Sequence, residues 1–164
     1  MCMADSSFDI ISKIDQMELD NAFNQCSREI ATRFDFKNTD TKIEKIGLKI
    51  LLESGTEERI NAALDVLKDK LIKRNVSLKH LDASEPALSG KTYRISCDFK
   101  EGISTENVKK IAKFLKENGP KSLKTQIQGE ELRVSSKSRD DLQTAIAQVK
   151  KETWDFAVQF TNYR

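Results

Sequence analysis

Apolar residues recur at helical spacing in four segments of the chain, and each segment therefore predicts an amphipathic helix. A residue whose side chain can cap a helix N-terminus precedes each segment. These capping residues are Asp15, Thr56, Ser104 and Ser138. The apolar positions are Leu19, Phe23, Cys26 and Ile30; Ile60, Ala63, Leu64, Leu67 and Leu71; Val108, Ile111, Ala112 and Leu115; and Leu142, Ala145, Ile146 and Val149. Gly119-Pro120 is expected to end the third helix.

Between the helices, alternating or continuous apolar runs rich in β-branched and aromatic residues predict strands. The predicted strands are Phe8–Ile14, Phe34–Lys37, Ile43–Ile46, Leu48–Glu53, Lys91–Lys100, Leu123–Gln128, Glu131–Ser135 and Ala157–Tyr163, with a weaker candidate at Val76–Leu81. Gly129 supplies the positive φ of a tight turn between the sixth and seventh of these strands, with Ile127, Leu132 and Val134 facing a core.

The two halves of the chain repeat the same pattern. Ile50, Leu52, Ser54, Thr56, Ile60, Ala63, Leu64 and Leu67 match Leu132, Val134, Ser136, Ser138, Leu142, Ala145, Ile146 and Val149 at a constant offset. Each half reads strand, helix, hairpin, helix, strand, which is the ferredoxin-like βαββαβ unit. We therefore predict an α+β protein of two ferredoxin-like domains, each with an antiparallel sheet covered by two helices on one face.

The segment 82–90 combines proline, glycine and small polar residues without apolar periodicity, and it is the predicted linker. The predicted domains are accordingly residues 1–88 and residues 89–164. The first strand and the last strand lie at the chain termini and can also pair across this boundary, and the sequence leaves such an exchange open.

The composition is that of an ordinary globular protein, with 164 residues, 38% hydrophobic and 33% charged. No basic segment followed by an apolar run opens the chain, and no apolar stretch is long enough to span a membrane, so we expect a cytoplasmic protein without a membrane partner. Cys2, Cys26 and Cys97 lack metal-type spacing. No disulfide, metal or cofactor is expected.

Charge is distributed unevenly along the sequence. Residues 1–88 carry 13 Lys and Arg against 16 Asp and Glu, whereas residues 89–164 carry 15 against 10, giving net charges of −3 and +5. The second half is therefore the better candidate partner of an anion. A charge of +5 is smaller than expected of a protein that grips long duplex DNA.

Four motifs together resemble the YajQ family of bacterial proteins over nearly the whole chain. They are Thr32-Arg33-Phe34-Asp35-Phe36, Gly90-Lys91, the stretch from Gln126 to Gln143, and Gln159-Phe160-Thr161-Asn162-Tyr163-Arg164. The resemblance implies tandem ferredoxin-like, ribonucleoprotein-like domains that bind nucleotides or RNA, with cyclic di-GMP as a ligand of some members. It implies no enzyme activity.

Polar side chains of the second half are expected on the open face of its sheet. Because Tyr93, Ile95, Cys97 and Phe99 form the inward set, the outward residues are Arg94, Ser96, Asp98, Gln126, Gln128, Arg133 and Gln159. A guanidinium with two amides suits phosphates and base edges. The alternative is a sheet face that is merely solvated or is covered by the other domain. The aromatic pattern of RRM domains is absent, which argues against their mode of base stacking.

Further candidate contacts lie outside that face. If Arg33 to Lys37 are extended, both phenylalanines share one face, and Arg33 with Asp35 can bind a phosphate and a base edge. Lys91 and Arg139 are additional anion candidates. The alternative for Arg33 to Lys37 is a core pair of aromatics with a surface ladder of charges.

Lysines on the third predicted helix form a basic ridge of Lys109, Lys113 and Lys116, which is a candidate RNA contact. Lysines opposite an apolar stripe are also commonly just solvated.

Enzyme chemistry finds little support. His80 is the only histidine, and it has no nucleophile signature near it. We therefore predict a non-enzymatic nucleotide-binding protein, with regulation by cyclic di-GMP as the specific hypothesis. One alternative is an RNA- or tRNA-binding protein that uses the lysine ridge. The other is a protein interaction module that has a regulatory partner and no nucleotide ligand.

Overall fold

The computed structural model describes residues 5–164, which form two domains. The terminal domain combines the residues up to Lys13 with Glu101–Arg164, and the inserted domain is Ile14–Lys100. Cys2 and most of the segment on which the expectation of no leader rests lie outside the described residues.

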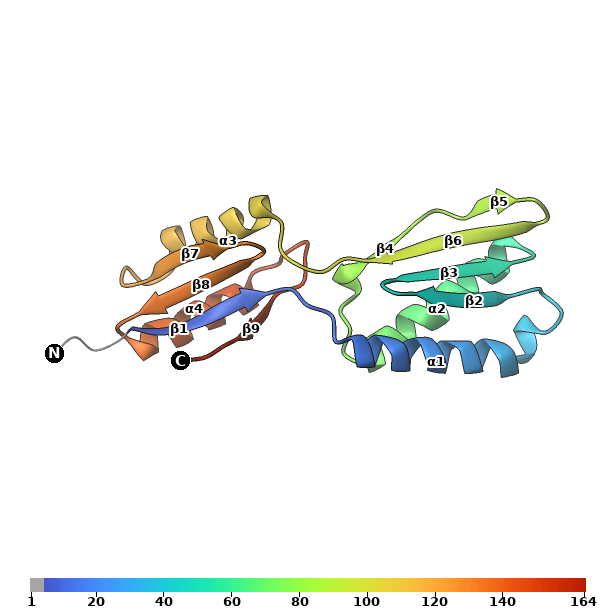
Figure 1. Ribbon diagram of the computed structural model, residues 1–164, viewed down its shortest axis with the longest axis horizontal. Helices are drawn as coiled ribbons and strands as arrows, with labels where there is room; N and C mark the ends of the chain where they lie inside the picture. Colours follow the sequence, from blue (N-terminus) through green and yellow to red (C-terminus); the bar gives the residue numbers. More distant parts are fainter. Residues whose placement is uncertain (1–4) are drawn as a thin grey trace. The chain divides into compact units, whose positions relative to one another are not determined.

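The terminal domain has the βαββαβ order (Figure 1). Its elements are β1 (Ser6–Ile11), α3 (Thr105–Asn118), β7 (Lys124–Gln128), β8 (Glu131–Ser136), α4 (Arg139–Lys151) and β9 (Gln159–Thr161). The antiparallel sheet has the strand order β7-β8-β1-β9. Apolar residues of α3 and α4 pack on Phe8, Ile10, Leu132 and Val134, so both helices cover one face and leave the other open.

The inserted domain contains the same kind of sheet in a permuted chain order. Its elements are α1 (Gln16–Thr32), the 3₁₀ turn η1 (Phe34–Phe36), β2 (Lys42–Ile46), β3 (Lys49–Ser54), α2 (Glu57–Lys73), the 3₁₀ turn η2 (Leu78–His80), β4 (Leu81–Ala83), β5 (Ala87–Ser89) and β6 (Thr92–Phe99). The strand order is β2-β3-β6-β4, and β5 pairs with the other end of β6. Strand β6 thus takes the place that β1 has in the terminal sheet.

This arrangement differs from the predicted boundary between residues 88 and 89. The first strand of each half pairs with the other half: β1 joins β8 and β9, whereas β6 joins β3 and β4. The segment 82–90 is therefore no linker between domains, since it forms β4, β5 and their connection within the inserted sheet. Of the two terminal strands whose exchange the sequence left open, β1 pairs with strands of the other half, whereas β9 stays in the sheet of its own half.

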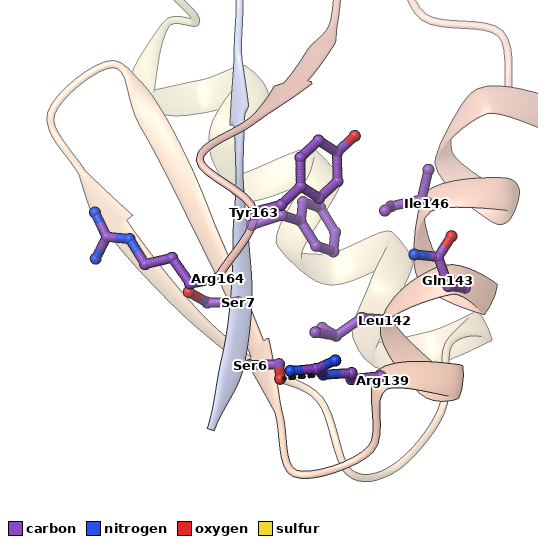
Figure 2. Close-up of a pocket in the computed structure, with 9 residues that line it drawn as sticks. Ser6, Ser7, Arg139, Leu142, Gln143, Ile146, Tyr163 and Arg164 are labelled. Atoms are coloured by element: carbon purple, nitrogen blue, oxygen red, sulfur yellow. Dashed lines mark hydrogen bonds between the residues drawn. The ribbon is translucent and has the colours of Figure 1, made fainter. Parts of the chain in front are cut away.

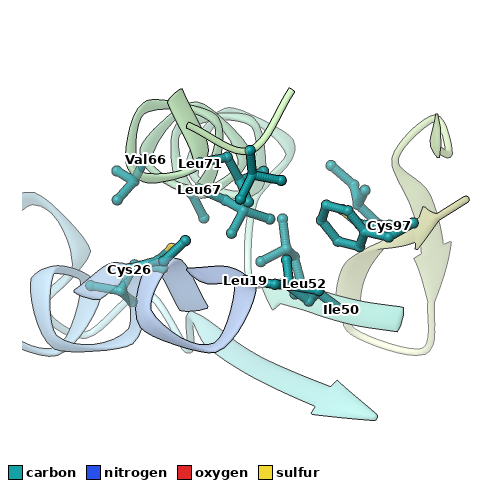
Figure 3. Packing of buried hydrophobic residues seen from close by; sticks show 14 of the residues in the cluster. Leu19, Cys26, Ile50, Leu52, Val66, Leu67, Leu71 and Cys97 are labelled. Carbon is teal, nitrogen blue, oxygen red and sulfur yellow. The ribbon is translucent and has the colours of Figure 1, made fainter. Parts of the chain in front are cut away.

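The predicted helices and caps are confirmed. Each of the four helices begins directly after its expected capping residue, whose side-chain oxygen accepts a backbone N–H of the first turn. The repeat also holds at the level of the core, because Ile50, Leu52 and Ser54 of β3 are buried like Leu132, Val134 and Ser136 of β8. Figure 3 shows Leu19 and Cys26 of α1 packed with Leu67 and Leu71 of α2 over β3.

Three strand predictions are corrected. Phe34–Lys37 is the turn η1 and not a strand, and Val76–Leu81 contains η2, with a strand only from Leu81. Strand β9 is shorter than predicted because Asn162 adopts a positive φ of 54°. Ile127, predicted to face the core, is 44% exposed, since β7 lies at the edge of its sheet.

Among residues 5–164, no helix combines the length and apolar character needed to cross a membrane.

Candidate functional site

The open face of the terminal sheet carries a buried ion pair. Asp9 of β1 lies opposite Arg133 of β8, and its side chain is only 3% exposed. Nε and Nη2 of Arg133 donate to the Asp9 carboxylate at 3.0 and 3.4 Å, and Nδ2 of Asn162 donates to it at 2.8 Å. These hydrogen bonds, first that from Arg133, hold the pKa of Asp9 below its usual value. Two donor groups of Arg133 are therefore already used.

The amides expected on this face have different surroundings. Gln126 lies opposite Arg133 and is exposed, whereas Gln128 lies opposite Glu131 and is half-buried. The side chain of Gln159 donates to the backbone oxygen of Lys13 at 2.6 Å. Gln126 is thus the amide whose position best fits contact with a ligand.

Arg33 and Asp35 pair with each other in the inserted domain. Nε and Nη2 of Arg33 donate to the two carboxylate oxygens of Asp35 at 2.9 and 2.6 Å, and Glu29 accepts from Nη1 at 3.3 Å. The guanidinium of Arg33, first through its hydrogen bonds, lowers the pKa of Asp35. The two N–H groups of Arg33 that would bind a phosphate are therefore already bonded to Asp35 in this structure. This pair stabilises the turn after α1.

The two phenylalanines of this motif do not share a face, contrary to the sequence prediction. Phe36 is 5% exposed, whereas Phe34 is 87% exposed. The cause is the 3₁₀ turn, because its period of about three residues separates side chains that a strand would align. The predicted pairing of core aromatics fails for Phe34.

Lysines of α3 line a hollow. Lys113 and Lys116, with Lys121 beyond the helix, surround the apolar side chains of Leu115 and Leu123 in a depression of about 570 Å³. Lys109 is exposed on the same helix outside that lining. Lys113 faces Glu117 at 4.0 Å.

Arg94, Ser96 and Asp98 point outward as predicted, but from the inserted sheet, because β6 belongs there. The sequence predicted these residues on one sheet face with Gln126 and Arg133, but the latter two belong to the sheet of the other domain. Lys91 lies after Gly90, whose φ is +64°, in the exposed turn between β5 and β6.

The open face of the inserted sheet forms a hollow of about 780 Å³, which we call the sheet hollow. Its middle row is Glu44, Leu51 and Ser96 on β2, β3 and β6. A second row contains Lys42, Glu53, Arg94 and Ala87. Lys49 opens the third row, opposite Asp98. The second row crosses β3 at Glu53 and the third row crosses it at Lys49, so these two outer rows are separated by roughly 13 Å along the strand.

Glu53 neutralises part of the charge in the sheet hollow. It accepts a hydrogen bond from Oγ1 of Thr92 at 2.7 Å and lies 3.6 Å from Nη2 of Arg94. The Thr92 bond, aided by Arg94, lowers the pKa of Glu53. Lys42 and Lys49 were not selected from the sequence. The alternation of exposed and buried residues along β2 and β3 could have found them, had it been applied to the first half.

The candidate residues are divided between the domains. Arg33, Asp35 and Lys91 belong to the inserted domain, whereas Gln126, Gln128, Arg133, Arg139 and the α3 lysines belong to the terminal domain. Because the strands are exchanged, the charge asymmetry of the two sequence halves also shrinks. The inserted domain carries 15 Lys and Arg and 15 Asp and Glu, and the terminal residues carry 13 and 11.

The described residues that could act as nucleophiles or metal ligands, Cys26, Cys97 and His80, have surroundings typical of structural roles. Burial raises the pKa of Cys26 to about 12 and that of Cys97 to about 11, so both thiols stay protonated. His80 is buried, with Nδ1 at 2.9 Å from the backbone oxygen of Lys100. Within the described part of the chain, no group of three or more His, Cys, Asp or Glu is placed to hold a metal ion.

Comparison with known proteins agrees with the family resemblance found in the sequence. Residues 6–164 match the family described as nucleotide-binding protein YajQ-like. A nucleotide-binding protein of Streptomyces coelicolor is 59% identical over 162 residues, which cover 99% of this chain and 100% of that protein. Nucleotide-binding proteins of Mycobacterium marinum and Mycobacterium tuberculosis are 59% identical over 163 residues, with the same coverage.

Proposed function

Because the chain belongs to the family of YajQ-like nucleotide-binding proteins, we propose that it binds a nucleotide in the sheet hollow without catalysing its conversion. The observation that carries this proposal is the combination of a hollow of about 780 Å³ with three cationic side chains, Lys42, Lys49 and Arg94, in the rows on either side of Leu51. This volume lies within the range of about 300–1,000 Å³ that is usual for small-molecule sites.

The arrangement of charges supports a ligand with two phosphates. Lys42 and Arg94 lie in one outer row and Lys49 in the other, with Leu51 between them. The long side chains of Lys49 and Arg94 can converge from the two rows on the adjacent phosphates of a cyclic dinucleotide, while Leu51 and Ala87 offer apolar contact to a base. Glu44 can accept hydrogen bonds from the N–H groups of guanine. Cyclic di-GMP therefore fits this chemistry.

A binding protein of this kind acts through a change in its affinity for a partner, since a ligand that binds two states unequally shifts their populations. We include in this proposal a regulatory protein partner, for which the affinity changes when the nucleotide binds. The hydrogen bonds of Arg33 to Asp35 and of Arg133 to Asp9 support a structural role for both arginines, so we assign the phosphate contacts to Lys42, Lys49 and Arg94 instead.

We expect Lys49→Glu combined with Arg94→Ala to weaken cyclic di-GMP binding at least a hundredfold. Each change removes a charge-assisted contact, for which about tenfold or more is usual. Isothermal titration calorimetry with cyclic di-GMP, GTP and ATP measures the effect. Lys79→Glu is the matched control, because Lys79 is an exposed lysine of the same domain outside the sheet hollow. Unchanged affinity in the double variant would overturn the proposal.

A second candidate function is RNA binding along α3, favoured by the lysine-lined depression beside Leu115 and Leu123. Under it, we expect Lys113→Glu with Lys116→Glu to abolish binding of a short single-stranded RNA. Replacement of both by Gln should reduce the slope of log K against log salt by about 1.4, because each phosphate contact contributes about 0.7. Fluorescence anisotropy at several salt concentrations measures this slope. A protein that binds neither RNA nor any nucleotide would be a protein interaction module.

A further inference from the structure

The terminal domain contains a second, smaller concavity of about 250 Å³, which we call the α4 slot. Buried Phe8, Leu142 and Ile146 supply its apolar lining, and Tyr163, Gln143 and Arg139 lie around it. Figure 2 shows the side chains of Gln143, Ile146 and Leu142 extending from α4 towards β1 and the segment after β9. The side chain of Arg164 points away from them. The slot thus has an apolar centre and a polar rim.

The aromatic ring at the slot is exposed on a fixed backbone. Tyr163 is 61% exposed, although its ring lies against Phe8 with centroids 6.4 Å apart. On one side, the side chain of Asn162 binds the buried Asp9, and on the other, Arg164 exchanges two backbone hydrogen bonds with Ser7 at 3.3 and 2.9 Å. A ring held in this way can stack on a ligand with little loss of conformational entropy.

The cation at the slot has no carboxylate partner among residues 5–164. Arg33, Arg59, Arg74, Arg94 and Arg133 all form ion pairs. Arg139 instead makes one long hydrogen bond, from Nε to the hydroxyl of Ser6 at 3.3 Å (Figure 2). Its remaining donors can therefore form a charge-assisted bidentate contact with a phosphate without first breaking an ion pair.

We infer that the α4 slot binds a purine nucleoside monophosphate. The base stacks on Tyr163 and packs against Leu142 and Ile146, while the phosphate lies against Arg139 and Ser6. The exposed amide of Gln143 can pair with N6 and N7 of adenine, so an adenine base is favoured. The volume of about 250 Å³ lies just below the range of about 300–1,000 Å³ that is usual for small-molecule sites, so the slot favours a mononucleotide over a dinucleotide. This site lies in the other domain from the sheet hollow and does not depend on it.

The test is calorimetric titration of the full chain with AMP, adenosine and inorganic phosphate. We expect Arg139→Ala to weaken AMP binding at least tenfold and to leave adenosine binding unchanged, because only the phosphate contact is lost. Tyr163→Ala is expected to weaken AMP and adenosine alike by about tenfold, since stacking contributes to both. Arg139 and Tyr163 are exposed, so both variants retain the fold.

Two controls separate this site from the sheet hollow. Arg28→Ala removes another exposed arginine that has no ion pair within the described residues, and it should leave AMP binding unchanged. Lys49→Glu should also leave AMP binding unchanged, whatever it does to cyclic di-GMP. The inference is overturned if AMP fails to bind at millimolar concentration, if either slot variant binds it normally, or if Lys49→Glu abolishes its binding.

Discussion

Residues 14–100 expressed alone are expected to fold cooperatively, whereas fragments 1–88 and 89–164 are each expected to remain unfolded. Strand β6 is central to the inserted sheet, since it pairs with β3 on one side and with β4 and β5 on the other. Fragment 1–88 lacks it. Fragment 89–164 likewise lacks β1, which lies between β8 and β9.

The size of this effect follows from what β6 buries. Ile95, Cys97 and Phe99 are all at most 4% exposed in the core of the inserted domain. Burial of a large apolar side chain contributes about 1.5–3 kcal/mol, and small domains have a total stability of about 5–15 kcal/mol. Removal of this strand, with its backbone hydrogen bonds on both sides, therefore eliminates most of the stability.

Circular dichroism and urea denaturation of the three fragments measure the result. The complementary control joins residues 5–13 to residues 101–164 through a short glycine linker. The backbone N–H of Gly102 donates to the oxygen of Ser12 at 2.6 Å, so the two ends to be joined already lie close together. This variant should also fold. A cooperative transition in fragment 1–88 would show that the domain boundary lies at the predicted place instead.

Replacement of Arg133 by Gln is expected to destabilise the terminal domain, because it leaves the carboxylate of Asp9 buried without its charged donor. An unsatisfied buried group of this kind costs about 1–3 kcal/mol, and more when it is charged. Urea denaturation at pH 7 measures the loss. The matched control is Arg94→Gln, whose partner Glu53 has a side chain that is 30% exposed and so loses less. Equal losses in the two variants would contradict the argument.

The same pair sets a pH dependence. The pKa of Asp9 is lowered in the folded protein, first by the hydrogen bond from Arg133 and also by that from Asn162. A depressed carboxyl pKa contributes stability that is fully present above the unfolded value of about 3.9 and is lost as the pH falls through the folded value. The stability gap between the native protein and Arg133→Gln should therefore be largest above pH 5 and shrink below pH 4. A gap that stays constant to pH 3 would refute this.

The role of Arg133 changes how binding experiments are interpreted. A loss of nucleotide binding in an Arg133 variant would not locate the ligand, because the same change destabilises the sheet that carries Gln126. The exposed lysines of the sheet hollow avoid this difficulty. Neither Lys42 nor Lys49 has a buried partner in the described part of the chain, so their replacement tests binding with little effect on the fold.

Local sequence patterns specify most of the secondary-structure elements and which of their side chains face the core. Each helix begins at the capping residue that the sequence predicts, and Leu132 and Val134 face the core while Arg133 faces away. These features depend on residues a few positions apart, so local spacing contains the information. The family resemblance also rests on short motifs, and the match over residues 6–164 confirms it.

Strand pairing and the neutralisation of charges, by contrast, depend on contacts between residues far apart in the sequence. Asp9 and Arg133 are 124 residues apart in sequence, yet they form the buried pair on the open face. Arg33 and Asp35 looked like a ligand contact, but their turn brings them together with Glu29 and Arg59. Every strand exposes the same backbone donors and acceptors, so the partner of β1 is selected by the whole core and not by its own residues.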